Sequence, residues 1–357
     1  MKRKLAAISA TLSLVMACGA SAITFTPFVT SGELITATGN DDAIGFAFAG
    51  NKFVGSVYFN NQLYQTDLAG NAPAKFGAPL PIASGALGEI YVSSSLGLGG
   101  FNSRDIFAGS QAGGTIWTYA NAATVATNAI TFATVSSGVV RSIAFDPYGQ
   151  YGFDMIVATS TGRIYRVNSS GFVTEIANLG FDTEGLDFTP QAFGSIAAGT
   201  LVVLSEGSGK VTAIAPNTYA KTDLGLTFNT PEMLSFVPTN FNQTLDPLAG
   251  FYAARYPTEV VKATRTEFAA YAGQAIVTEE GTHDLYAIAW NGTVFTKTII
   301  GDFGGQPEDG IFVTSAILDP GCSTRPEGCN DGTVPEPGTL ALLGLGVAGL
   351  AWRRRKQ

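Results

Sequence analysis

The sequence contains a single histidine, and this scarcity excludes most of the sites on which hydrolases and zinc enzymes depend. His283 lies in "EEGTHDLY", a segment typical of a hairpin tip, so a Ser-His-Asp triad would have to use a surface histidine. No Gly-x-Ser-x-Gly elbow, phosphate-binding Walker loop or histidine-based metal motif occurs. These absences favour a protein that is not an enzyme.

Charged residues are also scarce, at 13% of the chain, and the basic ones gather at its ends. Seven of the 20 lysines and arginines lie in the first four and last five residues. Between the two end segments, residues 23–333 hold 13 basic and 27 acidic residues, a net charge of −14. This balance excludes a nucleic-acid partner, whose phosphates need a basic surface. It suits an exported protein, or one that gathers cations.

Only three cysteines occur, and two of them, Cys322 and Cys329, share the Gly- and Pro-containing segment "GCSTRPEGCNDG". A zinc site would need two more ligands, and His283 is distant in the sequence. We therefore predict a small disulfide, formed in an oxidising compartment, within a linker at residues 322–333.

The N-terminus predicts export. Lys2, Arg3 and Lys4 precede an apolar run, and the small residues Ala20 and Ala22 form an Ala-x-Ala cleavage site. This is the organisation of a signal peptide over residues 1–22, handled by the Sec translocon and signal peptidase. A buried N-terminal helix is one alternative. Another is lipidation at Cys18, because "VMAC" loosely resembles the lipobox of bacterial lipoproteins. The lipoprotein alternative also predicts export.

Residues 334–357 are predicted to contain an unusually short membrane segment. The 13 apolar residues Leu340–Trp352 would form a helix about 20 Å long. A hydrocarbon core is about 30 Å thick, so this helix spans it only with snorkelling side chains or a thinned bilayer. The terminal Arg353, Arg354 and Arg355 would stop transfer and remain in the cytoplasm, with the body outside.

Together, Pro335-Glu336-Pro337, the short apolar helix and the basic end resemble the PEP-CTERM sorting signal. The resemblance covers only the last 24 residues. It implies a Gram-negative bacterium, often an exopolysaccharide producer, and recognition of the tripeptide by the membrane protease exosortase. It also implies transient anchoring in the inner membrane, followed by transfer to the cell surface or release. It implies nothing about the body.

The body, residues 23–321, is predicted to be all-β. Short strand-like phrases recur, most of them followed by a hairpin-like segment: "DAIGF", "GEIYV", "RSIAF", "EGLDF", "EMLSF" and "DGIFV". Intervals of 43 to 53 residues between the first five starts (42, 88, 141, 184 and 232) are typical of β-propeller blades. We predict six blades, with five or seven as alternatives, a β-helix as the second fold and a pair of β-sandwiches as the third.

The long last interval and the N-terminal segment depart from the regular spacing of the blades. The last interval, from 232 to 309, is too long for one blade, so "AGFYAARYPTEVVKATRTEF" is either an insertion or a degenerate blade. Strands within Thr24–Thr38 are expected to complete the last blade, which would protect the edges of the sheet.

Inner strands of a propeller line its axis, so the first residues of the phrases should converge. These residues are Asp42, Gly88, Arg141, Glu184, Glu232 and Asp309. We expect these acids to solvate the mouth of the funnel and to pair with Arg141. The alternative is that the funnel binds a metal, most plausibly Ca²⁺, or a polar sugar-like ligand.

Two functions remain open. The first is an exported, non-enzymatic propeller that binds exopolysaccharide, a matrix protein or Ca²⁺. The second follows from "DTEGLDF", which resembles the opening phrase of six-bladed propellers of the sugar-lactonase and phytase-like kind. That resemblance implies a metal on Glu184 and a Ca²⁺-dependent extracellular hydrolase, although no residue set assembles a full active site.

Overall fold

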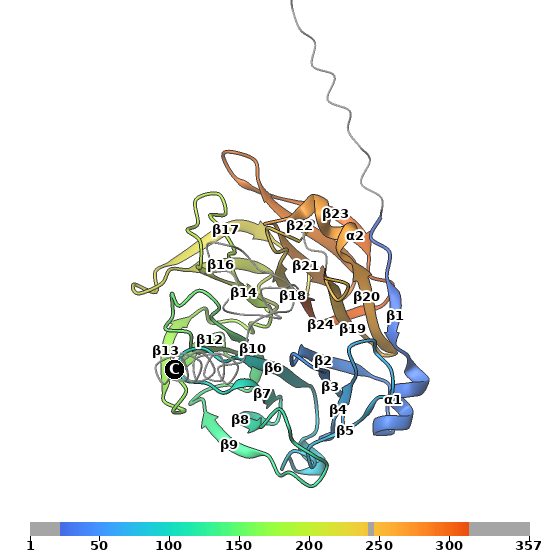
Figure 1. Ribbon diagram of the computed structural model, residues 1–357. Helices are drawn as coiled ribbons and strands as arrows, with labels where there is room; N and C mark the ends of the chain where they lie inside the picture. Colours follow the sequence, from blue (N-terminus) through green and yellow to red (C-terminus); the bar gives the residue numbers. More distant parts are fainter. Residues whose placement is uncertain (1–21, 242–245, 314–357) are drawn as a thin grey trace, which may run out of the picture.

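Each of the six short phrases contributes an inner strand to a separate four-stranded antiparallel sheet (Figure 1). The computed structural model describes residues 22–241 and 246–313. The inner strands are β2 (Ala43–Phe48), β6 (Ile90–Leu96), β10 (Val140–Phe145), β14 (Leu186–Phe188), β18 (Pro231–Phe236) and β24 (Gln306–Val313). Each lies beside the next, and β24 returns to β2. The predicted six-bladed β-propeller is therefore confirmed.

Four blades are built from four consecutive strands each. The strands that follow the inner ones are β3 (Phe53–Val57), β4 (Leu63–Thr66) and β5 (Ala74–Phe76); β7 (Ser103–Ser110), β8 (Gly113–Tyr119) and β9 (Ile130–Thr134); β11 (Met155–Thr159), β12 (Arg163–Val167) and β13 (Val173–Asn178); and β15 (Leu201–Ser205), β16 (Lys210–Ile214) and β17 (Lys221–Thr227). Gly- and Asn-containing turns join them, as the hairpin phrases predicted.

The last two blades are interleaved along the chain. After β18, the chain first forms β19 (Gly250–Tyr256) and β20 (Glu259–Thr264), which belong to the blade of β24. Helix α2 (Arg265–Phe268) and a 3₁₀ turn, Ala269–Tyr271, then connect β20 to the fifth blade. The chain completes the blade of β18 with β21 (Ala275–Glu279), β22 (Asp284–Trp290) and β23 (Phe295–Asp302). The long interval thus encodes neither a loop insertion nor a degenerate blade, but the two middle strands of the sixth blade.

The N-terminal segment completes the last blade, as expected, but it does so with one strand and not several. Strand β1 (Thr26–Val29) pairs with β20 as the outermost strand of the sixth blade. Residues Ser31–Thr38 form helix α1 instead. Thr30 and Glu33 make a capping box at its start, and Gly39, with φ of 90°, ends it in the left-handed conformation. Another 3₁₀ turn, Ser84–Ala86, precedes β6.

Hydrophobic cores lie between neighbouring blades. Six clusters of buried side chains occur in the described residues, and each draws on two adjacent sheets. Between the fifth and sixth blades, the ring of Phe251 lies 5.3 Å from that of Phe268 and 4.7 Å from that of Phe312. Every blade is therefore held on both flanks.

The predicted signal peptide through Ser21, the Cys322–Cys329 pair and the sorting segment lie outside the described residues. Among the residues that are described, no helix has the length and apolar character needed to cross a membrane.

The place of β19 in a core leads to a prediction. Phe251 is fully buried, so Phe251→Ala should lower the free energy of unfolding by about 3–5 kcal/mol. Phe172→Ala is the matched control, because Phe172 is 70% exposed, and it should change little. Chemical denaturation measures both. Equal, small effects would mean that the β19–β20 hairpin is only loosely attached.

Candidate functional site

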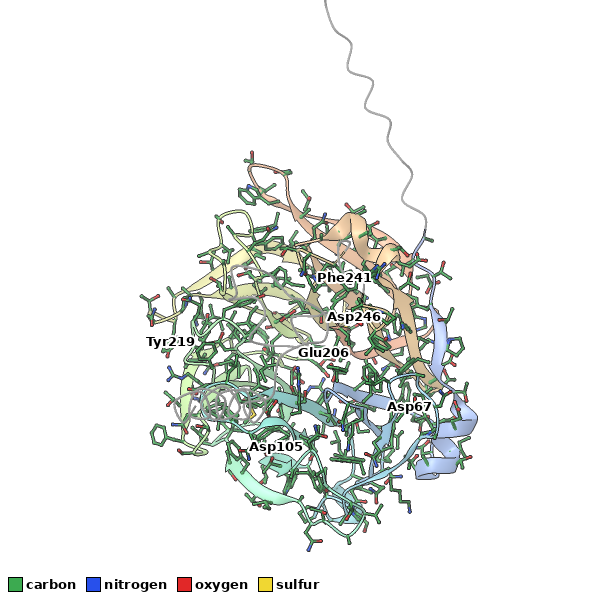
Figure 2. The ribbon with its side chains drawn as sticks, viewed as in Figure 1. Asp67, Asp105, Glu206, Tyr219, Phe241 and Asp246 are labelled. Atoms are coloured by element: carbon green, nitrogen blue, oxygen red, sulfur yellow. The ribbon has the colours of Figure 1, made fainter. Side chains whose placement is uncertain are left out.

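The starts of the inner strands meet at one end of the central channel and bring seven carboxyl groups together. We call this set the acidic mouth: Glu89, Asp182, Glu184, Glu206, Glu232, Glu280 and Glu308. Arg141, in β10, forms ion pairs there with Glu89 (2.8 Å), Asp182 (3.2 Å), Glu206 (2.5 Å) and Glu184. Figure 2 shows Glu206 toward the centre of the ring, whereas Tyr219 lies toward its outside.

Two positions in the blades supply six of these seven acids, and Asp182 lies in the segment before β14. Glu89, Glu184, Glu232 and Glu308 lie just before or near the start of an inner strand. Glu206 and Glu280 directly follow β15 and β21, the second strands of their blades. Because the second strand runs antiparallel to the first, it ends where the first begins. Both sets of acids therefore reach the same mouth.

Arg141 also belongs to a hydrogen-bond network. Its Nη1 donates to the Tyr91 hydroxyl at 2.9 Å, and that hydroxyl donates to Glu89, which also accepts from Gln111. Burial opposes the charge of Arg141, but the surrounding carboxylates, Glu184 first, raise its pKa above the ordinary value. Arg141 is thus a permanent cation, and seven carboxyl groups surround it, of which Glu184, Glu232 and Glu308 have pKa values raised mainly by burial.

Glu232 differs from the other members of the acidic mouth in its lack of a polar partner within the described part of the chain. It is only 6% exposed, and its carboxylate has no hydrogen bond or ion pair with any described residue. Its side chain nevertheless points at other acids, since oxygens of Glu184, Glu206 and Glu232 all lie within 4.8 Å of one another. Burial, followed by the charge of Glu184, raises the pKa of Glu232 well above its usual range. Such an arrangement suits a hard cation.

The structure brings together three of the predicted funnel residues, Arg141, Glu184 and Glu232. The other positions differ. Gly88 and Asp309 are each one residue away from the side chain that reaches the mouth, which is Glu89 in one blade and Glu308 in the other. The carboxylate of Asp42 is not an ion-pair partner of Arg141.

Glu206 and Glu280 were missed by the sequence analysis, which examined inner strands alone. The signal that identifies them is an acid directly after the second strand, in "VVLSEG" and "AIVTEE". Gln306 bridges Glu280 and Glu308, donating to them at 2.7 and 2.9 Å.

Below the mouth, the axis holds a cavity of about 750 Å³, into which Arg141, Glu184, Glu232 and Glu308 also face. Two further carboxylates line its walls and fasten neighbouring inner strands together. Asp187 accepts the Phe236 amide at 2.7 Å, and Asp309 accepts the Phe46 amide at 3.2 Å. Burial raises the pKa of Asp187 to about 6 and that of Asp309 to about 7.

Comparison with known proteins identifies a sorting motif in the tail and, for the body, a similarity of fold only. A family model described as the PEP-CTERM protein-sorting motif matches residues 333–356. The chain carries a PEP-CTERM sorting motif. This motif indicates an exported protein that exosortase sorts by way of the membrane. No curated protein matches the chain.

The propeller body resembles solved structures in fold alone. One of them, a crystal structure of a nidogen/laminin complex, aligns with a TM-score of 0.50 and 14% identity. The alignment covers 75% of this chain and 83% of the other. At this identity the likeness supports the propeller architecture and carries no function.

The buried aspartates of the cavity predict a pH dependence. Their pKa values are raised on folding, so the stabilising contribution is complete below about pH 4 and is lost as the pH rises toward 7. In the Asp187→Asn/Asp309→Asn variant, the loss of stability between pH 4 and 7.5 should be smaller by roughly 6 kcal/mol. Denaturation at both pH values measures it. Asp223→Asn is the surface control, and a double variant with the wild-type slope would contradict the assignment.

The ion pairs of Arg141 predict a loss of stability on its removal. Arg141→Met leaves the buried Glu184 and three half-buried carboxylates without a cation and should cost about 3–5 kcal/mol at pH 7 in the presence of a chelator. Arg163, whose pair with Glu175 is at the surface, provides the control Arg163→Met, which should change little. A neutral effect of Arg141→Met would show that the acids of the mouth do not repel one another.

Proposed function

We propose that this exported protein acts at the cell surface or in the extracellular matrix as a binding module, and that its acidic mouth holds Ca²⁺. The observation that carries the proposal is the buried, unpaired carboxylate of Glu232 beside Glu184 and Glu206. Burial and the neighbouring carboxylates disfavour the charged form of Glu232, and a bound divalent cation would stabilise that form.

The donor set fits this ion. Ca²⁺ takes six to eight oxygen ligands at about 2.3–2.6 Å, so two oxygens on one ion lie up to about 5 Å apart. The three glutamate oxygens satisfy that limit, being within 4.8 Å of one another. The Arg141 ion pairs use Oε2 of Glu184 and Glu206, and no cation of the described residues pairs with Glu232.

Three carboxylates fill only part of such a coordination sphere. The remaining positions would accept hydroxyl or carboxylate oxygens of an exopolysaccharide or a matrix protein, which gives the ion a role in attachment. The acidic body alone would repel a polyanionic matrix, and the ion would bridge the two.

The sorting tail supports the location. In this proposal, the Sec translocon exports the chain, signal peptidase cuts after Ala22, and Arg353, Arg354 and Arg355 hold the C-terminus in the cytoplasm. Exosortase then recognises Pro335-Glu336-Pro337. A disulfide between Cys322 and Cys329 would form a collar between the propeller and the tail.

Calorimetry and thermal unfolding of the full chain in detergent test the site with CaCl₂, MgCl₂ and a chelator. Ca²⁺ at about 100 times its Kd should stabilise the protein by about 2.7 kcal/mol. Glu232→Gln should weaken Ca²⁺ binding at least tenfold, whereas the surface control Glu175→Gln should not. Absence of Ca²⁺ binding to the wild-type chain would contradict the proposal.

A turnover assay with lactone and phosphoester substrates separates binding from hydrolysis. The binding module predicts no turnover with or without Ca²⁺. Ca²⁺-dependent turnover that Glu184→Gln abolishes would replace it with the hydrolase alternative.

A further inference from the structure

The channel contains a second, unpaired charge at the end opposite the acidic mouth. Arg104 lies near the start of β7, and the register pairs Ser103 with Leu96, the last residue of β6. The acidic mouth lies where the inner strands begin, at Glu89 for β6. At about 3.3 Å per residue, the length of β6 places Arg104 roughly 20 Å along the channel from the mouth.

Arg104 is buried without a polar partner. It is 7% exposed, and neither Nη1 nor Nη2 has a hydrogen-bond partner among the described residues. The guanidinium carbon lies 5.4 Å from the centre of the Phe48 ring. The adjacent Asp105 does not neutralise it, because its carboxylate accepts from Asn102 and from the backbone of Asn121.

Arg141 is a second buried arginine of this protein, and its ion pairs provide a comparison for Arg104. Its guanidinium contacts four carboxylates, whereas that of Arg104 forms no ion pair with a described residue. Burial lowers the pKa of Arg104 only to about 10, so it remains charged at neutral pH. A buried cation with unsatisfied donors destabilises a fold, and stacking on one aromatic ring offsets only part of that effect.

The surroundings of Arg104 indicate the kind of partner. It lines the same cavity of about 750 Å³ that reaches the acidic mouth, within the size range of small-molecule sites. The walls also include Phe48, Leu96, Leu98 and Phe153, which are apolar. An anion would satisfy the guanidinium, and an apolar body would cover these side chains.

We infer that the channel binds a small organic carboxylate, with its carboxyl group on Arg104 and its apolar part against Phe48 and the neighbouring apolar walls. A guanidinium holds a planar carboxylate through two parallel hydrogen bonds, and neither Nη1 nor Nη2 of Arg104 has another partner among the described residues. The negative acidic mouth repels the anion, which fixes its orientation in the channel. This site is separate from the proposed Ca²⁺ site and does not depend on it.

Calorimetry of the full chain in a non-ionic detergent tests the inference with benzoate, its neutral analogue benzamide, glucuronate and inorganic phosphate. Benzoate should bind, benzamide should bind at least tenfold more weakly, and Arg104→Met should weaken benzoate at least tenfold. Arg163→Met should leave benzoate binding unchanged. The titrations are repeated with a chelator present, where benzoate binding should persist even if the Ca²⁺ proposal fails.

Thermal unfolding of the free protein provides the second readout. Arg104→Met should have a higher melting temperature than the wild-type chain, because it removes an unpaired buried charge. A lower melting temperature would mean that Arg104 has a structural role, and would overturn the inference. So would benzoate binding that is absent, or unchanged in Arg104→Met. Binding of phosphate or glucuronate alone would overturn the apolar part of the ligand assignment.

Discussion

Closure of the ring is the constraint on which the rest of this structure depends. Six inner strands surround one axis, and the starts of several bring acids to the same end, so side chains up to about 220 residues apart in the sequence are forced together. Repulsion among the carboxyl groups of the acidic mouth opposes this arrangement. Hydrophobic burial between blades must outweigh it, and among the described residues Arg141 is the guanidinium that pairs with several of these acids.

The channel is consequently polarised along its length. Excess negative charge lies at one end and the unpaired guanidinium of Arg104 at the other, and one cavity connects them. These two sites call for partners of opposite charge. A cation at the acidic mouth and an organic anion at Arg104 would satisfy both, and neither partner requires catalytic chemistry from the chain. A binding module exported to the cell exterior is consistent with this arrangement.

Regular spacing of short phrases was enough to predict six blades, because each blade repeats the same local pattern. The pairing partner of a hairpin is not a local property, so "AGFYAARYPTEVVKATRTEF" gave no sign that it belongs to the sixth blade. In the mouth, a shift of one residue reverses the side a strand residue faces, and Glu89 and Glu308 replaced Gly88 and Asp309 for that reason. Helix α1 could have been predicted from the capping residues Thr30, Glu33 and Gly39. The lack of a hydrogen-bond partner for Arg104 among the residues described could not, because it depends on tertiary contacts.

Crystallography with an anomalous scatterer tests the central claim, that ring closure builds a cation site at the acidic mouth. Crystals of the full chain grown with Ca²⁺ and then exchanged with Tb³⁺ should give an anomalous difference peak between the carboxylates of Glu184, Glu206 and Glu232, within about 2.6 Å of their oxygens. A map without a peak there, in crystals that bind the metal elsewhere, would contradict the account.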